Sequence, residues 1–160
     1  MKAADQLRYL RVEVRELVNV HWWRWLTVWF GSTFLAVATY RIDRALYLRL
    51  GRLWRVIRTL LTPVLLVLRP FLRPCEIHYM ADIGPGLKIL HPGLGVVVSK
   101  YAVIGANLHL TGGNCIGGRP TDDRRLEIGD DVSLGANAVV LGPITIGNRV
   151  QIGAGAVAVD

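Results

Sequence analysis

Aliphatic residues recur every six positions through the second half of the chain. After residue 100 most of them are six apart, and five such repeats follow one another directly from Ile128 to Ile152. A glycine often comes next, as in Ile128-Gly129 and Ile152-Gly153. This period is typical of a parallel β-helix, in which each hexapeptide forms one short strand and one corner of a prism. We therefore predict a β-helix over residues 76–160.

The period also identifies the side chains that should point into the prism and stack from coil to coil. They are Ile77, Ile83, Ile89, Ile104, Leu110, Ile116, Ile128, Leu134, Val140, Ile146 and Ile152. From Ile128 onwards a second small or branched residue follows four positions after each of them, at Val132, Ala138, Ile144, Val150 and Ala156. Glycine and asparagine between these positions suit corners, where a β-branched residue is disfavoured.

Two interruptions of the period mark candidate binding segments. The spacing is nine between Ile89 and Val98 and twelve between Ile116 and Ile128. The second interruption contains the polar segment 118–125, which has no inward aliphatic residue and therefore predicts an extruded loop. Loops on a rigid scaffold commonly carry binding residues.

Residues 1–75 follow a helical period instead, with apolar residues recurring between arginines. The chain has a net charge of +7, and twelve of its arginines lie in the first half. We predict α-helices there, interrupted at Pro63, Pro70 and Pro74. The uncharged stretch 25–40 is shorter than the roughly 20 residues of a membrane-spanning helix, so we do not expect it to cross a bilayer.

The aromatic residues of this basic region leave two interpretations open. Four tryptophans lie close together, at Trp22, Trp23, Trp25 and Trp29. With arginines nearby they fit a helix at a membrane surface, or an apolar face that is buried in an oligomer. The arginines alternate with aliphatic residues, and the sequence contains no recognised nucleic-acid-binding motif. We therefore do not expect nucleic-acid binding.

The cysteines and the N-terminus bear on the compartment. Cys75 and Cys115 form neither a CxxC pair nor a disulfide framework, so a reducing cytoplasm is expected. The N-terminus begins with a charged amphipathic stretch and shows no cleavable signal peptide. We expect a cytoplasmic protein, with peripheral contact at the inner face of the membrane as the alternative.

Several short strings in residues 76–160 belong to a known pattern. They are Glu76-Ile77-His78, Ile83-Gly84-Pro85-Gly86, His91-Pro92-Gly93, Val96-Val97-Val98, Ile116-Gly117-Gly118, Asp123-Arg124-Arg125 and Ile152-Gly153-Ala154-Gly155-Ala156. Together they resemble the serine O-acetyltransferases and their exopolysaccharide-associated relatives among the hexapeptide acyltransferases. The resemblance implies a left-handed parallel β-helix preceded by an α-helical region, and an acyl-CoA-dependent O-acyltransferase. It also implies acetyl-CoA as co-substrate, no metal, and active sites between subunits of a homotrimer or dimer of trimers.

By this resemblance His91 is the general base. An imidazole titrates near neutral pH, so it can take the proton of an acceptor hydroxyl and pass it to the departing thiolate. Glu76 matches the carboxylate that orients the imidazole. The two residues are 15 apart, slightly less than one coil of three hexapeptides, so they are expected to meet on adjacent coils.

The acceptor is less defined, because two positions depart from the serine-specific pattern. Leu90 stands where serine acetyltransferases carry the aspartate that holds the substrate's amino group, and Arg125 stands where they carry a second histidine. Arg124 and Arg125 are instead candidates for holding an acceptor carboxylate or phosphate. The acceptor is therefore an L-serine-like molecule or a sugar.

The resemblance also places the coenzyme A arm beside small residues at the corners. The matching positions are Gly117, Gly118, Gly135, Ala136, Gly153 and Ala154. Corner geometry alone also accounts for each glycine. Two other functions remain open: acyl transfer to a lipid-linked or membrane-bound acceptor, and a non-catalytic β-helix scaffold.

Overall fold

A computed structural model describes residues 2–18, 31–72, 75–118 and 125–159 of the chain. Its helices come first: α1 (Ala3–Val18), α3 (Ser32–Leu50) and α4 (Arg52–Leu72). The tryptophan cluster of the sequence analysis lies outside the described residues. Among the helices in these ranges, none combines the length and the apolar character needed to cross a membrane.

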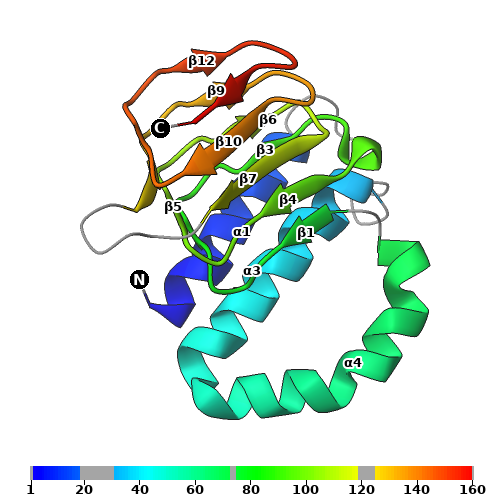
Figure 1. Cartoon of the computed structure of the whole chain (residues 1–160). Coiled ribbons are helices and arrows are strands. Elements are labelled where there is room, and N and C mark those ends of the chain that lie inside the picture. Colours follow the sequence, from blue (N-terminus) through cyan, green and yellow to red (C-terminus); the bar gives the residue numbers. More distant parts are fainter. Residues whose placement is uncertain (1, 19–30, 73–74, 119–124, 160) are drawn as a thin grey trace.

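The remaining chain forms a left-handed parallel β-helix, as predicted (Figure 1). Sheet A contains β1 (Cys75–Ile77), β4 (Val96–Val98), β7 (Asn114–Gly118), β10 (Val139–Gly142) and β13 (Val157–Ala158). Sheet B contains β2 (Asp82–Ile83), β5 (Ala102–Ile104), β8 (Leu126–Ile128) and β11 (Thr145–Ile146). Sheet C contains β3 (Lys88–Ile89), β6 (His109–Leu110), β9 (Ser133–Leu134) and β12 (Gln151–Ile152). A short 3₁₀ helix, η2 (Pro92–Leu94), joins β3 to β4.

The predicted inward residues stack in columns at the centre of the prism. In sheet B the register pairs Ile83 with Ile104, Ile104 with Ile128, and Ile128 with Ile146. All four are buried, and Ile83 is 0% exposed. The six-residue period is therefore confirmed as the stacking of aliphatic side chains from successive coils.

The two interruptions of the period change the length of the coils that contain them. Val97 pairs with Cys115, an offset of 18 residues or three hexapeptides. Glu76 pairs with Val97 at an offset of 21 residues, because η2 is inserted before β4. Cys115 pairs with Val139 at an offset of 24 residues, because the segment between β7 and β8 is longer. Both interruptions therefore lie at corners and leave the strands in register.

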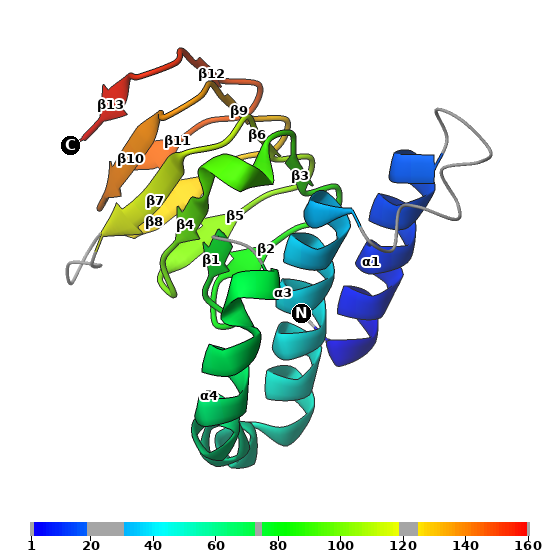
Figure 2. The ribbon, with the colours of Figure 1, turned by 90° about the vertical axis from the view of Figure 1, so that its right-hand side faces the viewer.

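Helices α1 and α3 lie beneath the first coil and run in opposite directions (Figure 2). The first coil of a solenoid has no preceding coil to pair with, so its backbone groups need other partners. Helix α3 supplies several of them. The Tyr40 hydroxyl donates to the Ala81 carbonyl at 3.0 Å and accepts the Ile83 N–H at 3.2 Å, and the Thr33 hydroxyl donates to the Ile89 carbonyl at 3.0 Å.

Charged side chains supply further hydrogen-bond partners for the first coil. Arg41 donates to the carbonyls of Ile83 at 2.7 Å and Gly84 at 2.6 Å. The guanidinium also pairs with Glu13 of α1, whose carboxylate accepts the Leu87 N–H at 3.0 Å. Arg41 and Glu13 are both buried. The helices and the β-helix thus share one interior, which joins α1, α3 and the first coil.

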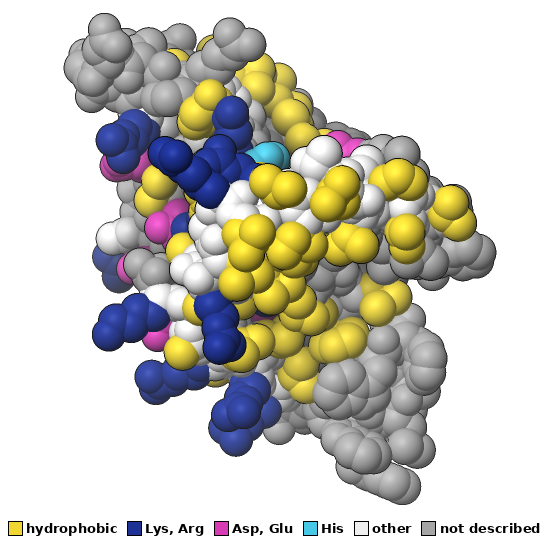
Figure 3. All heavy atoms as spheres, turned by 90° about the horizontal axis from the view of Figure 1, so that it is seen from below, with side chains coloured by type: hydrophobic (Ala, Val, Ile, Leu, Met, Phe, Trp, Pro, Cys, Tyr) yellow, Lys and Arg dark blue, Asp and Glu magenta, His cyan; other side chains and the backbone are white. Residues whose placement is uncertain are grey.

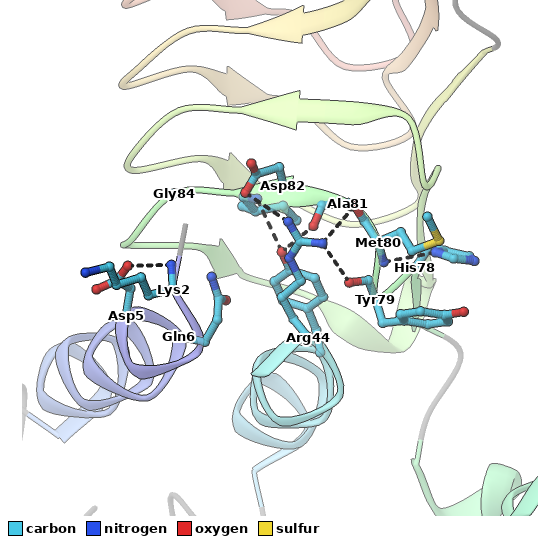
Figure 4. A network of polar contacts seen from close by, with 12 residues as sticks. Lys2, Asp5, Gln6, Arg44, His78, Tyr79, Met80, Ala81, Asp82 and Gly84 are labelled. Atoms are coloured by element: carbon cyan, nitrogen blue, oxygen red, sulfur yellow. Dashed lines mark hydrogen bonds and ion pairs between the residues drawn. The ribbon is translucent and has the colours of Figure 1, made fainter. Parts of the chain in front are cut away.

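Arg44 lies about one helical turn after Arg41 on α3 and contacts the same coil (Figure 4). It donates to the Met80 carbonyl at 3.2 Å and pairs with Asp82 at 3.4 Å. Arginines predicted only as part of a basic helical surface therefore have a structural role, because α3 faces the unpaired edge of the β-helix.

One expectation about the helical region needs correction. Helix α4 does not break at Pro63 or Pro70, since it extends from Arg52 to Leu72. Each proline removes one helical hydrogen bond and favours bending, and α4 curves beneath the molecule (Figure 1). The last part of the uncharged stretch 25–40 belongs to α3, where Val37 is buried in the core.

Replacing Tyr40 by phenylalanine is expected to lower the free energy of unfolding by about 1–3 kcal/mol, because two buried backbone groups lose their partner. Burial raises the pKa of Tyr40 to about 12, so the hydroxyl remains a donor across the working pH range. Urea unfolding measures the loss. Tyr47→Phe is the control, since the Tyr47 ring packs edge-on against Tyr79 and faces the Arg44 guanidinium, and a phenylalanine ring keeps both contacts. Equal losses for both variants would contradict the capping role.

Candidate functional site

His91 lies at the corner where the chain passes from sheet C to sheet A. It directly follows Leu90 and precedes η2, and its side chain is exposed. The His91 N–H donates to the Thr111 carbonyl at 2.9 Å, and its carbonyl accepts the Leu94 N–H at 3.1 Å. The backbone of the predicted base is therefore fixed from both sides while the imidazole remains accessible.

Four successive corners between sheets C and A form one edge of the prism, which we name the C/A edge. Its corners are residues 91–95, 111–113, 135–137 and 153–155. Backbone hydrogen bonds tie each corner to the next: Gly113 N–H to Gly95 at 2.6 Å, Asn137 N–H to Gly112 at 2.9 Å, and Gly155 N–H to Ala136 at 2.8 Å. His91 stands at one end of this column.

Glu76 lies on β1, at the start of the coil that ends with His91, so the two residues belong to one coil and not to adjacent coils as expected. It is exposed and pairs in register with Val97. The thiol of the neighbouring Cys75 donates to the Pro92 carbonyl at 3.5 Å, and burial raises the pKa of that thiol, so it keeps its proton. This contact holds the residues next to Glu76 and next to His91 against each other at one corner.

A groove of about 850 Å³ runs beside Glu76, between α3, α4 and the outer face of β1 and β4. Its walls are largely apolar, with Leu46, Leu61 and Ile77 among them. His78 also lines it. Its Nδ1 accepts the Met80 N–H at 3.1 Å, and burial, with Arg58 and Lys100 nearby, lowers its pKa. His78 therefore stays neutral near pH 7 and holds the turn that follows β1.

The structure divides the six predicted coenzyme positions between two edges. Four of them, Gly135, Ala136, Gly153 and Ala154, lie on the C/A edge with His91. A Cβ on Gly135 would come within 2.5 Å of the Ala154 nitrogen, so this glycine is required for close stacking of the coils. Gly153 occupies the equivalent corner one coil further along, on the last coil that the structure describes.

Gly117 and Gly118 are at the opposite end of sheet A, where β7 ends. They pair with Leu141 and Gly142 of β10. Gly118 has a φ of 132°, and a Cβ on it would overlap the Gly142 backbone. We name this side of the prism, where the chain leaves sheet A for sheet B, the A/B edge.

Of the two predicted acceptor arginines, Arg125 lies on the A/B edge. Arg125 is exposed and directly precedes β8, whereas Arg124 lies outside the described residues. A single chain thus places Arg125 and Gly118 on one edge and His91 on another. The structure does not bring the predicted acceptor arginine and the predicted base together within one chain.

The sequence interpretation missed Asn114, a buried polar residue behind the C/A edge. Its side-chain oxygen accepts the Gly112 N–H at 2.9 Å, and its amide donates to the Gly135 carbonyl at 2.7 Å. Asn114 is 1% exposed, and it fixes two neighbouring corners. Asn114 follows Leu110 by four residues, a position where later repeats carry Val132 or Ala138. A polar residue at this apolar position was the sequence feature that could have identified it.

Comparison with protein families supports the repeat. Residues 126–158 match the family model described as "Bacterial transferase hexapeptide (six repeats)". The chain is 38% identical to the serine acetyltransferase of Helicobacter pylori over 124 residues, which are 76% of this chain and 68% of that protein. It is also 38% identical over 115 residues to the putative colanic acid biosynthesis acetyltransferase WcaB of Escherichia coli K12, covering 67% of this chain and 70% of WcaB.

Solved structures agree with this similarity. The Neisseria gonorrhoeae serine acetyltransferase superimposes with a TM-score of 0.74 at 30% identity, covering 98% of this chain and 59% of that one. The serine acetyltransferase of Brucella abortus in complex with coenzyme A gives a TM-score of 0.70 at 26% identity, covering 95% and 60%. The chain spans only part of the length of its relatives; for example, the match covers 33% of serine acetyltransferase 4 of Arabidopsis thaliana.

Proposed function

Because the chain belongs to the family of hexapeptide-repeat acetyltransferases that includes the serine acetyltransferases, we propose that it transfers an acetyl group from acetyl-CoA to an acceptor hydroxyl. His91 acts as the general base and Glu76 orients it. One observation carries the proposal: the base and a column of small residues lie along the C/A edge, and a contact from Cys75 to Pro92 joins the neighbour of Glu76 to the neighbour of His91.

The chemistry follows from the exposed imidazole of His91. It takes the proton of the acceptor hydroxyl while the oxygen attacks the thioester carbonyl carbon, and the bond from that carbon to sulfur then breaks. The proton passes to the departing thiolate, so the products are an O-acetyl ester and free coenzyme A. Glu76 stabilises the imidazolium that exists between these two proton transfers.

Coenzyme A is proposed to lie along the C/A edge, with its arm beside Ala136, Gly153 and Ala154. These residues are small and at least partly exposed, so peptide groups there are accessible to the amides of the arm. Similarity to a serine acetyltransferase solved with coenzyme A supports coenzyme A as the ligand of this chain.

A homotrimer, alone or paired as a dimer of trimers, would complete the site. His91 on the C/A edge and Arg125 on the A/B edge face different directions of one prism. Cyclic symmetry brings different edges of neighbouring copies together. In such a trimer the A/B edge of one copy, with Gly117, Gly118 and Arg125, would lie across from the C/A edge of the next.

We propose a sugar hydroxyl as the acceptor, with an L-serine-like molecule as the alternative. Leu90, directly before the base, is 60% exposed and offers no charge to an ammonium group. Similarity to a protein named for colanic acid biosynthesis also favours a sugar. Arg125 would then hold a carboxylate or phosphate of the acceptor. We place the reaction in the cytoplasm.

An acceptor panel tests this function. Release of coenzyme A thiol, followed with DTNB, is expected to depend on acceptor and to be faster with sugars and nucleotide sugars than with L-serine. Leu90→Asp should lower KM for L-serine by about tenfold, because a carboxylate beside the base pairs with the ammonium. Leu90→Asn is the matched control, since it adds polarity without charge.

Two results of the panel would count against the proposal. Acetyl-CoA binding without turnover on any acceptor would favour a non-catalytic scaffold. Turnover only with acceptors embedded in vesicles would favour the alternative of a lipid-linked or membrane-bound acceptor.

A further inference from the structure

Helix α4 exposes a continuous row of large apolar side chains. Its members are Leu53 (57% exposed), Val56 (58%), Leu60 (74%), Val64 (55%) and Val67 (72%). Their spacing of three or four residues places them on one face of the helix. Soluble domains rarely leave such a row uncovered unless it binds something. We name this row the α4 face.

The α4 face lies in a strongly basic part of the chain. From Arg44 to Cys75, both included, the sequence contains seven arginines and no aspartate or glutamate. Arg52 and Arg55 are exposed on α4 itself. Figure 3 shows the molecule from below, with hydrophobic side chains gathered in a patch and Lys and Arg side chains along one side of it. An apolar face next to exposed arginines such as Arg52 and Arg55 matches an anionic lipid surface.

The opposite side of α4 holds the helix to the rest of the molecule. The Trp54 indole donates to Asp43 of α3 at 2.6 Å, and Arg58 pairs with the same carboxylate at 2.9 Å. Because Asp43 anchors that side, the α4 face is directed away from α3. The arrangement gives an amphipathic helix fixed to the body with its apolar row outward.

We propose that the α4 face lies in the surface of an anionic bilayer, parallel to the membrane plane. The apolar row would enter the boundary between headgroups and acyl chains, and Arg52 and Arg55 would contact lipid phosphates. A second copy of the chain fits less well. Packing two identical α4 faces together would bring arginines against arginines, with no carboxylate on α4 to neutralise them.

Co-sedimentation of the full chain with vesicles tests the proposal. We expect binding to vesicles of phosphatidylcholine with about one third phosphatidylglycerol, and weaker binding to phosphatidylcholine alone. Leu60→Glu should lower the partition coefficient by at least about tenfold, because it places a charge in the apolar row. Replacing Arg52 and Arg55 by glutamine should lower it by about fivefold each on anionic vesicles only.

Val103→Glu is the matched control, because it introduces the same charge at an exposed apolar residue of β5, in sheet B and outside the α4 face. It should bind vesicles as the unchanged protein does, and circular dichroism checks that every variant is folded. The proposal is overturned if the unchanged protein stays in the supernatant, or if Leu60→Glu leaves binding unaltered. If light scattering shows that Leu60→Glu has a lower oligomer mass than the unchanged protein, while its vesicle binding is unaltered, the α4 face would instead be a protein interface.

Discussion

Replacing His91 by alanine is expected to lower kcat for acetyl transfer by about 10²–10⁴-fold, the usual contribution of a positioned general base. Without the imidazole, the acceptor hydroxyl must lose its proton to water during attack on the thioester. The affinity for acetyl-CoA should change little, because the variant keeps the backbone hydrogen bonds of residue 91 to Thr111 and Leu94 at the C/A edge. DTNB kinetics measure the rate, and isothermal titration calorimetry measures coenzyme binding.

His109→Ala provides the matched control for this prediction. His109 is also an exposed histidine of the β-helix, on β6 of sheet C, and we expect its replacement to leave kcat within about twofold. A His91→Ala enzyme that keeps its rate, with retained secondary structure, would remove His91 from the mechanism. Equal losses in both variants would point to folding as the cause.

The same assay can distinguish the role of Glu76 from that of His91. As a residue that positions His91, Glu76 acts only through the imidazole. Glu76→Gln should therefore lower kcat less than His91→Ala does, and the double variant should be no slower than His91→Ala alone, since residues acting as a unit are not additive. Additive losses would instead assign Glu76 an independent role, for example in the groove beside α3 and α4 that it lines.

Replacing Arg41 by alanine is expected to lower the free energy of unfolding by about 3–5 kcal/mol, the usual cost of breaking a buried ion pair. The Arg41 side chain is 0% exposed, and its loss would leave the buried Glu13 carboxylate without its cation. The carbonyls of Ile83 and Gly84 would lose their donors as well. Urea unfolding at fixed protein concentration measures the change.

A second ion pair between α1 and the β-helix gives the control. Glu16 pairs with Lys88 at 2.7 Å, but both side chains are about 40% exposed. Glu16→Gln should therefore cost less than about 1 kcal/mol. If Arg41→Ala destabilises the protein no more than Glu16→Gln, then the Arg41 network does not hold the helices on the first coil.

The Arg41 network matters because it satisfies one end of the solenoid. Each coil beyond the first receives hydrogen bonds from the coil before it, whereas the first coil has only helices beneath it. A buried carbonyl without a donor costs free energy comparable to a lost hydrogen bond. Tyr40 and Arg41, on adjacent positions of α3, together satisfy Ala81, Ile83 and Gly84.

The β-helix was predictable because its information is local and repeated. Each hexapeptide carries its own inward aliphatic residue, so Ile104, Ile128 and Ile146 could be aligned without any knowledge of distant contacts. The two breaks in the period likewise located the corner of His91 and the segment before Arg125. The residue types at these corners indicated the chemistry, through their resemblance to a known family.

Contacts between distant segments were not predictable from the period. Arg41 and Glu13 are 28 residues apart and look like ordinary surface charges in their helices. Helix α4 extends through Pro63 and Pro70 although local propensity predicts interruptions there. Asn114 is polar at a position where the repeat carries aliphatic residues, and its partners, Gly112 and Gly135, lie on different coils.

The sequence by itself therefore determined the β-helix, its inward columns and His91 as the residue to test, because a six-residue period is a local property. Tertiary structure alone decided that α1 and α3 close the first coil, because the partners of an unpaired strand edge come from wherever the chain returns. It also decided that His91 and Arg125 stand on different edges of the prism, because the edge on which a residue lies depends on how the coils wind in space.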